Sequence, residues 1–396
     1  MDGNLNPHRF GPSRPIEPSA RIPRVLRLAL TASVLAFMLI GCTGEESTSS
    51  PNLLLVTIDT LRADRLGCYG GQAETGEAIC RPMQDGIRYD WAFSTAPYTV
   101  PAVASALTSL YPSGHALSQF SSAPMDQELE TLAEQLSRAG YRTAAFVSNP
   151  VLSANRNLTQ GFDTYDDEMN RTERNRPGYS ERSAEDTTKA VRKWLEGVEG
   201  PWILWVHYQD PHGPYERPGA APAVDRDDAA PLRVSKTPSG YRALPSYQVL
   251  SEAVNFETYR DRYVDEIDYL DQWMSELLDF VAKKDPGAGV LVTADHGEAF
   301  GEDGYFFCHG HSLGLDQIRV PLLWRPPGGV EPSTRDTPVS LIDVAPTLLA
   351  AAGLPSPESW QGRPLGTAAE ESSWQRALFS EHSARSAVIV GGHYYA

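Results

Sequence analysis

Positive charge and cysteine are both scarce in this chain. Its 396 residues include 34 Lys and Arg against 51 Asp and Glu, which gives a formal net charge of −17. A chain this acidic lacks the broad positive surface that attracts nucleic acid or anionic lipid, so no nucleic-acid partner is expected. A small anionic substrate would need local cations or a metal ion to overcome the negative field.

The four cysteines leave little room for cross-links. Cys42 belongs to an N-terminal export segment, so three cysteines remain for the folded part. An odd number in an exported chain permits at most one internal disulfide. Cys68 and Cys80 are the nearest pair in the sequence, with Cys308 left over, and buried free thiols are the alternative.

Residues 1–41 have the layout of a signal peptide. Three arginines precede the apolar run "LALTASVLAFMLIG", which is short for a transmembrane helix. The run ends in "LIGC", which resembles the bacterial lipobox and implies lipidation of Cys42; a plain N-terminal membrane anchor is the alternative. We therefore expect an exported, membrane-anchored lipoprotein that faces the periplasm or the cell exterior. Residues 42–51 are then a flexible linker, and 52–396 the folded domain.

Apolar runs of strand length alternate with helical patterns along the rest of the chain. Strands are predicted at 52–59, 141–149, 201–210, 289–295 and 319–325, and helices at 125–140, 181–197, 256–284 and 340–353. This alternation predicts an α/β fold with a mostly parallel, doubly wound sheet and helices on both faces. Residues 216–250 form a long excursion rich in Pro, Asp and Ala. The sequence ends in "GGHYYA" without an obvious closing element, which leaves a truncated C-terminal part open.

Polar residues follow several of the predicted strands. They are Asp59, Asn149, His207, Asp210, His212, Asp295 and His296. Sheets of this class bind ligands at the carboxyl ends of their strands. Side chains that are far apart in the sequence are therefore expected to gather along one edge of the sheet.

Two carboxylates and a histidine in this set favour a metal ion. Asp295 and His296 stand together where a strand opens into a turn, and Asp59 ends another buried strand. Carboxylate and imidazole ligands suit a divalent cation, and Glu298 is placed to orient the histidine. The alternative for Asp59 is a helix cap.

Three further histidines are candidates for substrate contacts. His212 lies in "HYQDPHGPY" and is expected to hold an anionic oxygen or to protonate a leaving group, with a structural turn residue as the alternative. His309 and His311 alternate in "CHGHS", so in an extended segment both face one side. They could bind an anion or a second metal, or lie in a solvated loop.

From residue 51 to about 353 the chain resembles the sulfatase family of the alkaline phosphatase superfamily. The matching motifs are "PNLLLVTIDTLRADRLGCYG", "YTVPAVASALTSLYPSGHA", "AGYRTAAFVSN", "HYQDPHGPY", "TADHGEAFGE", "IRVPLL" and "DVAPTLLAAAG", in the order of the family. The resemblance implies a sulfatase-like catalytic domain over 52–396. It also implies a metal-assisted hydrolase of anionic esters, with Asp59, Asp295 and His296 holding the cation.

The active-site helix departs from the family pattern. Sulfatases carry Cys-x-Pro-Ser-Arg there, with the cysteine or serine oxidised to formylglycine. The corresponding residues here are Thr99, Pro101, Ala102 and Val103. Threonine is not a substrate for that oxidation, so no formylglycine is expected, and the neighbouring arginine is absent.

Other cations and ligands of the family pattern are also missing. Ser148 and Pro150 fall near the positions of expected cations, and Thr60 stands where many sulfatases have a second aspartate. These losses fall at the site and leave the scaffold motifs intact.

Threonine nucleophiles occur elsewhere in this superfamily, in nucleotide phosphodiesterases and phosphoglycerol transferases. We therefore expect Thr99 to attack a phosphate-type ester, with phosphodiesters or phosphonates favoured over sulfates; a structural N-cap is the alternative. The expected cofactor is one divalent ion (Ca, Mn, Mg or Zn). Its ligands are Asp59, Thr99, Asp295 and His296; His212 is the second catalytic residue, and Asn149, His309 and His311 bind substrate.

The partner expected from this reading is a small anionic ester, or the head group of an envelope glycan or lipid. Two other functions stay open. One is a phosphotransferase that acts on envelope lipid or glycan head groups. The other is a catalytically silent binding lipoprotein, which a lack of bound metal would favour.

Overall fold

The structure is a computed structural model that describes residues 50–118, 123–173, 175–221, 232–236, 240–250, 255–366, 375–383 and 385–396. The expected signal peptide, Cys42 and most of the linker lie outside these residues. Within the described part of the chain, no helix is both long and apolar enough to cross a membrane.

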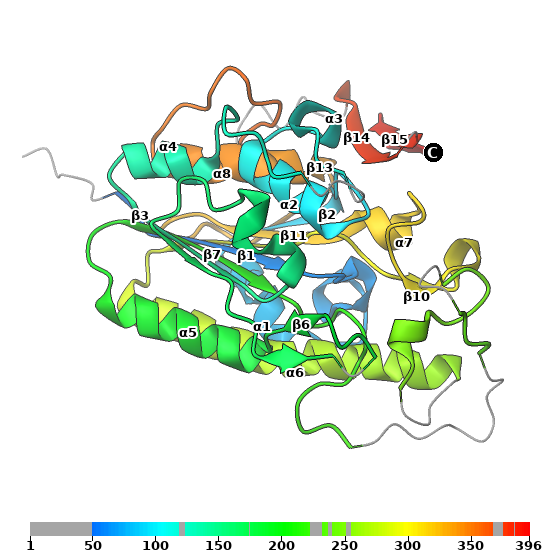
Figure 1. Cartoon of the computed structure of the whole chain (residues 1–396). Coiled ribbons are helices and arrows are strands. Elements are labelled where there is room, and N and C mark those ends of the chain that lie inside the picture. The colour runs from blue at the N-terminus through cyan, green and yellow to red at the C-terminus, as the bar shows by residue number, and fades with distance from the viewer. Residues whose placement is uncertain are drawn as a thin grey trace, which may run out of the picture. The chain divides into compact units, whose positions relative to one another are not determined.

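A nine-stranded sheet forms the centre of the unit that begins after the linker (Figure 1). Its strand order is β12-β2-β11-β8-β1-β7-β3-β4, with β13 paired to β2. The strands are β1 (Leu53–Ile58), β2 (Ile87–Phe93), β3 (Arg142–Val147), β4 (Thr164–Asp166), β7 (Trp202–Tyr208), β8 (Gly289–Ala294), β11 (Arg319–Arg325), β12 (Ser333–Arg335) and β13 (Val339–Ser340).

The central strands are buried over their whole length because helices cover both of their faces. β1, β7 and β8 are buried at every residue, as continuous apolar runs predict. β1 pairs in parallel with β7 and β8, and β7 in turn with β3. The predicted mostly parallel sheet is confirmed. The exception is β11, which runs antiparallel to both β8 and β2.

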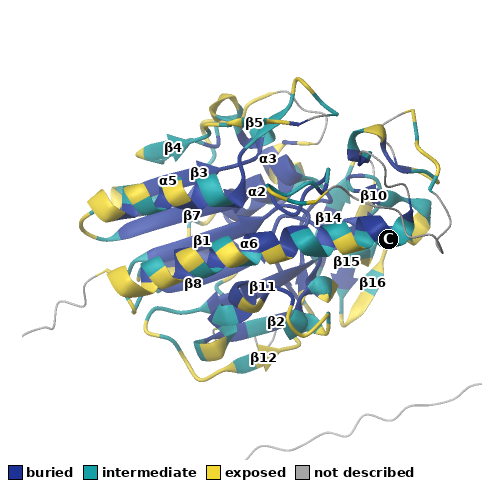
Figure 2. Ribbon diagram, turned by 90° about the horizontal axis from the view of Figure 1, so that it is seen from below, coloured by how far each residue is buried: buried dark blue, intermediate teal, exposed yellow. Residues whose placement is uncertain are grey.

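Helices lie on both faces of the sheet (Figure 1). One face carries α2 (Thr99–Thr108), α4 (Leu132–Arg138) and α8 (Val344–Ala351), and the other α1 (Glu77–Cys80), α5 (Ala184–Gly197) and α6 (Phe256–Lys284). In Figure 2, α5 and α6 are striped with buried and exposed residues, as expected of amphipathic helices that lie on a sheet. The doubly wound arrangement is therefore confirmed.

Two predicted helices are shorter than their patterns. The helix predicted from residue 125 begins at Leu132, because Thr131 and Glu134 form a reciprocal capping box there. The last predicted helix starts with a 3₁₀ turn, η8 (Leu341–Asp343), where the carboxylate of Asp343 accepts from the backbone amide of Ser340 at 2.9 Å. In both cases hydrogen bonds at the cap set the start of the helix more sharply than hydrophobic spacing does.

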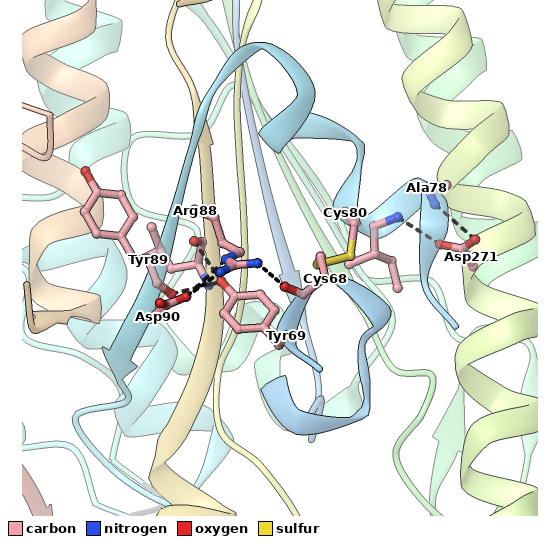
Figure 3. The surroundings of a disulfide bond; sticks show 10 residues. Cys68, Tyr69, Ala78, Cys80, Arg88, Tyr89, Asp90 and Asp271 are labelled. Carbon is pink, nitrogen blue, oxygen red and sulfur yellow. Dashed lines mark hydrogen bonds and ion pairs between the residues drawn. A yellow bond between two sulfur atoms is a disulfide. The ribbon is translucent and has the colours of Figure 1, made fainter. Parts of the chain in front are cut away.

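The segment between β1 and β2 is fastened at several points (Figure 3). A disulfide joins Cys68 to Cys80, which confirms the one internal cross-link that the sequence allows; Cys308 is buried and outside any disulfide. Arg88 donates to the carbonyl of Cys68, and Asp271 on α6 accepts hydrogen bonds from the amides of Ala78 and Ile79 in α1. These contacts fix the chain that leads away from the end of β1.

Smaller elements lie around the central sheet. They are α3 (Pro112–His115), β5 (Arg171–Thr172), β6 (Ser180–Glu181), β9 (Ala299–Phe300), β10 (Phe306–Cys308), α7 (Leu315–Ile318), β14 (Leu378–His382), β15 (Arg385–Val390) and β16 (His393–Tyr395). The last three form an antiparallel sheet that the sequence analysis did not predict. Leu378 and Ile389 from this sheet pack with Ile318 in a separate small core.

Candidate active site

Parallel register brings the two aspartates of the predicted site together. The last residue of β1 pairs with the last residue of β8, Ile58 with Ala294. Asp59 and Asp295 follow these two residues, so they leave the sheet side by side. The amide of Asp295 also donates to the carbonyl of Ile58 at 3.3 Å.

Asp59, Asp295 and His296 form a buried cluster of possible metal ligands. Their nearest donor atoms all lie within 4.8 Å of one another. Nε2 of His296 is 3.7 Å from Oδ1 of Asp59 and 3.5 Å from Oδ2 of Asp295. Each side chain is 0% exposed.

Hydrogen bonding sets which nitrogen of His296 faces the cluster. Nδ1 lies 2.9 Å from the carbonyl oxygen of Gly297, to which it donates. In the neutral ring Nε2 then carries the lone pair that a metal ion needs. Glu298, expected to orient this histidine, does not do so. The carbonyl of Gly297 already accepts the proton on Nδ1 of His296. Oε1 of Glu298 instead lies 3.5 Å from Nδ1 of His309.

The donor set fits a divalent cation. Oδ1 of Asp59 and Oδ2 of Asp295 are buried and have no hydrogen-bond partner among the described residues. Burial raises the pKa of Asp59 to about 6 and also raises the pKa of Asp295, on which the charge of Asp59 acts further. Two unsatisfied carboxylate oxygens and one imidazole nitrogen converge where a metal ion would stabilise them.

Thr99 lies beside this cluster at the first turn of α2. Its Oγ1 is 3.3 Å from Nε2 of His296, the nitrogen that faces both aspartates. Tyr98, with extended backbone angles, is the N-cap of α2, and Thr99 is the first helical residue. The N-cap alternative for Thr99 is therefore wrong.

The positions that depart from the sulfatase pattern are occupied by structural residues. Ala102 and Val103 are buried and pack in the main hydrophobic core, so α2 supplies no cation here. Pro150 begins a 3₁₀ turn, η4 (Pro150–Leu152). Thr60 adopts a positive φ of 57°, and its amide donates to Oδ1 of Asp295 at 3.2 Å. At Thr60 the backbone therefore contacts the cluster in place of a carboxylate.

Asn149 bridges Asp59 to the next loop. Its Nδ2 donates to Oδ2 of Asp59 at 2.5 Å, and its Oδ1 accepts from the hydroxyl of Tyr179 at 2.8 Å. The same oxygen accepts from the amide of Val151 at 3.0 Å, which caps the following turn. Asn149 thus holds the carboxylate of Asp59 in one orientation.

His207 approaches Asp59 from β7. Its Nε2 lies 3.6 Å from Oδ2 of Asp59, and its Nδ1 lies 2.8 Å from the hydroxyl of Thr57, which also accepts from Trp205. The sequence placed His207 at the edge of the sheet but gave it no role. The structure makes it a neighbour of the candidate metal ligands.

His309 and His212 line the same site. The ring of His309 is 4.4 Å from that of His296 and 5.1 Å from that of His212, measured between centroids. Nδ1 of His212 donates to the carbonyl of Gly213 at 2.7 Å, which leaves Nε2 to interact with a ligand. Burial is the main cause that lowers the pKa of both His212 and His309.

His311 makes different contacts from His309. Its ring stacks on Tyr305 at 5.3 Å with an interplanar angle of 13°. Gly310 between the two histidines has a φ of +75°, so the segment is not extended. The expectation that both rings face one side fails at this glycine.

The β5–β6 hairpin contributes residues to the site that no sequence pattern indicated. Tyr179 reaches Asn149 from this hairpin, and Arg176 lies against the ring of Tyr179, 4.0 Å from its centroid. A two-residue strand on each side carries no recognisable hydrophobic pattern, so the sequence offered no signal for their position.

Comparison with known proteins gives a consistent result. The sulfatase family model matches residues 51–354 of this chain. The uncharacterised sulfatase YidJ of Escherichia coli K12 is 24% identical over 350 residues, which cover 79% of this chain and 70% of YidJ. Choline-sulfatase of Rhizobium meliloti is 25% identical over 364 residues, which cover 78% and 69% of the two chains.

Solved structures share the fold at lower identity. BT4656, determined in complex with its substrate D-glucosamine-2-N,6-O-disulfate, superposes with a TM-score of 0.68 at 17% identity, covering 86% of this chain and 87% of the other. The phosphonate monoester hydrolase of Agrobacterium radiobacter superposes with a TM-score of 0.59 at 18% identity, covering 87% and 89%. The overall fold that the resemblance implied is therefore confirmed.

Proposed function

The chain belongs to the sulfatase family, and from that premise we propose that it is a metal-dependent hydrolase of anionic esters with Thr99 as the nucleophile. The observation that carries the proposal is the 3.3 Å separation between Oγ1 of Thr99 and Nε2 of His296. It puts the only reactive oxygen of the first turn of α2 against the three candidate metal ligands. The position is where the family pattern has its modified cysteine.

Asp59, Asp295 and His296 would hold the divalent ion, with Thr99 as a further ligand. When bound, such an ion lowers the pKa of a coordinated hydroxyl and neutralises charge on the substrate. The buried, unpartnered oxygens of Asp59 and Asp295 support this assignment.

In the proposed reaction Oγ1 of Thr99 attacks phosphorus, and the proton of its hydroxyl passes to the leaving oxygen. The new bond from phosphorus to Oγ1 forms while the bond to the leaving alcohol breaks. Water then attacks the threonine ester, breaks the bond to Oγ1 and returns a proton to Thr99. The net result is hydrolysis, with one water consumed.

His212 and His309 are placed to handle the protons of this reaction. Nδ1 of His212 is committed to the carbonyl of Gly213, so Nε2 is the atom that exchanges a proton with the leaving oxygen or with water. Burial keeps the pKa of His212 well below its usual range, and an anion nearby favours the charged form. His309, between His212 and His296, is proposed to contact the substrate, and His311 to lie further from the reacting atoms.

Substrate class follows from the nucleophile. A threonine alkoxide gives a stable phosphate or phosphonate ester that water can still cleave, and the hydrated aldehyde of formylglycine is not expected here. We therefore place phosphodiesters and phosphonate monoesters ahead of sulfate esters. The fold neighbours include proteins that act on sulfated sugars and on phosphonate monoesters, which supports an anionic ester as the general class.

We also propose that the protein is an exported lipoprotein anchored through Cys42. Disulfides persist mainly in oxidising compartments, so the Cys68–Cys80 bond supports export. The anchor is tested by expressing full-length wild type and Cys42→Ser with radioactive palmitate and following the label on the protein. Label is expected on wild type and not on Cys42→Ser, and an unlabelled wild type would contradict lipid anchoring.

The catalytic proposal is tested with four 4-nitrophenyl probes: bis(4-nitrophenyl) phosphate, 4-nitrophenyl phenylphosphonate, 4-nitrophenyl phosphate and 4-nitrophenyl sulfate. Wild type, Thr99→Ala and Thr99→Ser are each loaded with Mn, Zn, Ca or Mg. Thr99→Ala is expected to lower kcat by several orders of magnitude, with partial retention in Thr99→Ser. Thr108→Ala, which removes a buried hydroxyl at the other end of α2, is the control and should keep kcat. Turnover that survives in Thr99→Ala would overturn the assignment.

A further inference from the structure

Arg176 lies between two tyrosine rings at the edge of the candidate site. It belongs to the loop that joins β5 to β6. Its guanidinium carbon is 4.0 Å from the ring centroid of Tyr179 and 4.5 Å from that of Tyr247. The side chain is 29% exposed, so the group is held by the protein yet reachable from solvent.

Each of these tyrosines leads directly to a residue of the site. The hydroxyl of Tyr179 donates to Asn149, which in turn donates to Asp59. The ring of Tyr247 stacks on His212, with centroids 6.4 Å apart and an interplanar angle of 24°. Arg176 is thereby placed beside both the metal-ligand side and the histidine side of the site.

Glu173 fixes the orientation of the guanidinium. Its two carboxylate oxygens accept from Nε and Nη2 of Arg176, both at 2.6 Å, in a bidentate pair. The side chain of Glu173 is fully buried. This pair uses one edge of the guanidinium and leaves Nη1 outside it, so donors are available in a fixed direction.

The charge of Arg176 reaches several site residues. Burial is the largest cause of the pKa shifts of Asp59, His212 and His309, and Arg176 acts on all three. Two positions at which the family pattern has a cationic side chain carry no cation in this chain. Val103 packs in the core, and Pro150 starts a turn. An arginine from a different loop is thus available for the same electrostatic task.

We propose that Arg176 binds a non-bridging oxygen of the substrate, and that its pairing with Glu173 selects esters that carry a single negative charge. The inference deepens the proposed function and rests on it. The ion pair is neutral overall, so it adds hydrogen-bond donors to the site without adding net positive charge. Phosphodiesters and phosphonate monoesters carry one charge and match such a site, whereas a phosphate monoester carries nearly two near neutral pH.

Binding can be measured without turnover. In a metal-loaded Thr99→Ala background, bis(4-nitrophenyl) phosphate is titrated calorimetrically into the single variant and into Glu173→Gln/Arg176→Met. The added pair of substitutions removes both charges together, which avoids leaving Glu173 buried without a partner. Loss of a charge-assisted hydrogen bond predicts roughly 10- to 100-fold weaker binding. The control is Arg192→Met/Glu276→Gln, which removes an exposed Arg–Glu pair between α5 and α6 and should leave binding unchanged.

Arg176→Lys is a milder second variant, included in case the double substitution disturbs the fold. It keeps a cation beside Glu173 but loses the planar bidentate geometry, so roughly 3- to 10-fold weaker binding is expected. Melting temperature and metal content are measured for each variant. Binding within twofold of the background in both Arg176 variants would overturn the proposal.

Glu173→Gln tests the selection for charge in the wild-type background. Removing the carboxylate leaves a net positive guanidinium, so kcat/KM for 4-nitrophenyl phosphate should rise at least several-fold relative to bis(4-nitrophenyl) phosphate. An unchanged ratio would overturn the selectivity. Should wild type hydrolyse none of the probes, the proposed function fails, while the calorimetric result still decides whether Arg176 binds the anion.

Discussion

The hydroxyl oxygen of Thr99 lies 3.3 Å from Nε2 of His296, a contact that joins the first turn of α2 to the carboxyl end of β8. Of the Cys-x-Pro-Ser-Arg pattern this part of α2 keeps only the proline, Pro101, and Val103 at the arginine position belongs to the core. The contact between Thr99 and His296 does not need the missing arginine, because it depends on where α2 starts. Tyr98, in an extended conformation, ends the preceding segment and sets that start.

Asp59→Asn should change stability in opposite directions with and without metal. In the metal-free protein it removes a buried charge, so the free energy of unfolding should rise by roughly 1–3 kcal/mol. In the metal-loaded protein it removes a ligand, and the stabilisation that metal gives, about 4 kcal/mol at a thousandfold excess over Kd, should be mostly lost. Chemical denaturation with EDTA or with added Mn measures both. A loss of stability in EDTA would contradict the buried-charge argument.

Asn149→Ala should weaken metal binding without removing a ligand. Oδ2 of Asp59 would lose the amide that orients it, and loss of such an outer contact typically lowers metal affinity about 10- to 100-fold. Titration of the metal-free protein with Mn gives the affinity. Tyr179→Phe is the matched variant, since it removes only the hydroxyl that donates to Asn149, and it should have a smaller effect. Equal affinities for wild type and Asn149→Ala would rule out the positioning role.

The sequence was sufficient for the three candidate metal ligands. Asp59, Asp295 and His296 each follow a strand whose continuous apolar run is visible in the sequence, and parallel pairing brings the ends of such strands together. Two local facts determine the site once these strands are recognised. They are the pairing of β1 with β8 and the start of α2.

The partners of these residues were harder to predict. The sequence offers two acceptors for Nδ1 of His296, the carbonyl of Gly297 and the carboxylate of Glu298. Only the geometry of the turn determines that the carbonyl of Gly297 accepts the hydrogen bond. Arg176 depends on a loop whose packing carries no periodic pattern. The direction of β11 was equally hidden, because an antiparallel neighbour and a parallel one give the same buried run in a covered sheet.

Removing the disulfide should lower stability while leaving the site intact. Cys68 and Cys80 are 12 residues apart, and a loop of this size predicts a loss of about 3 kcal/mol on opening it. Urea denaturation of Cys68→Ser/Cys80→Ser against wild type measures the change. Asp271→Asn is measured beside it, because this substitution weakens the hydrogen bonds that attach α1 to α6. Metal affinity is expected to be unchanged in the cysteine variant, and a loss of more than tenfold would show that this segment also holds Asp59.

His115 should make the fold sensitive to acid. It lies buried against α2, with Nε2 3.2 Å from the carbonyl of Pro101 and 3.1 Å from the hydroxyl of Ser105, and Nδ1 accepts from the amide of Leu117. Burial lowers its pKa from 6.5 to about 4. Because the folded-state pKa lies below the unfolded value, the unfolded chain binds more protons between these limits. Stability is therefore full above pH 6.5 and falls as the pH is lowered toward 4.

Between pH 6.5 and pH 5, His115 alone should lower the free energy of unfolding by about 2 kcal/mol. Urea denaturation at pH 7.5 and pH 5 is compared for wild type and His115→Asn, so that the contributions of all other groups cancel. The variant is expected to be less stable at pH 7.5, where the three hydrogen bonds of His115 are intact in wild type. That deficit should shrink by about 2 kcal/mol at pH 5, because Asn does not take up a proton. His393→Asn, at an exposed position, is the control. A deficit of the same size at both pH values would show that the pKa of His115 is the same in the folded and the unfolded chain, and so that burial against α2 does not lower it.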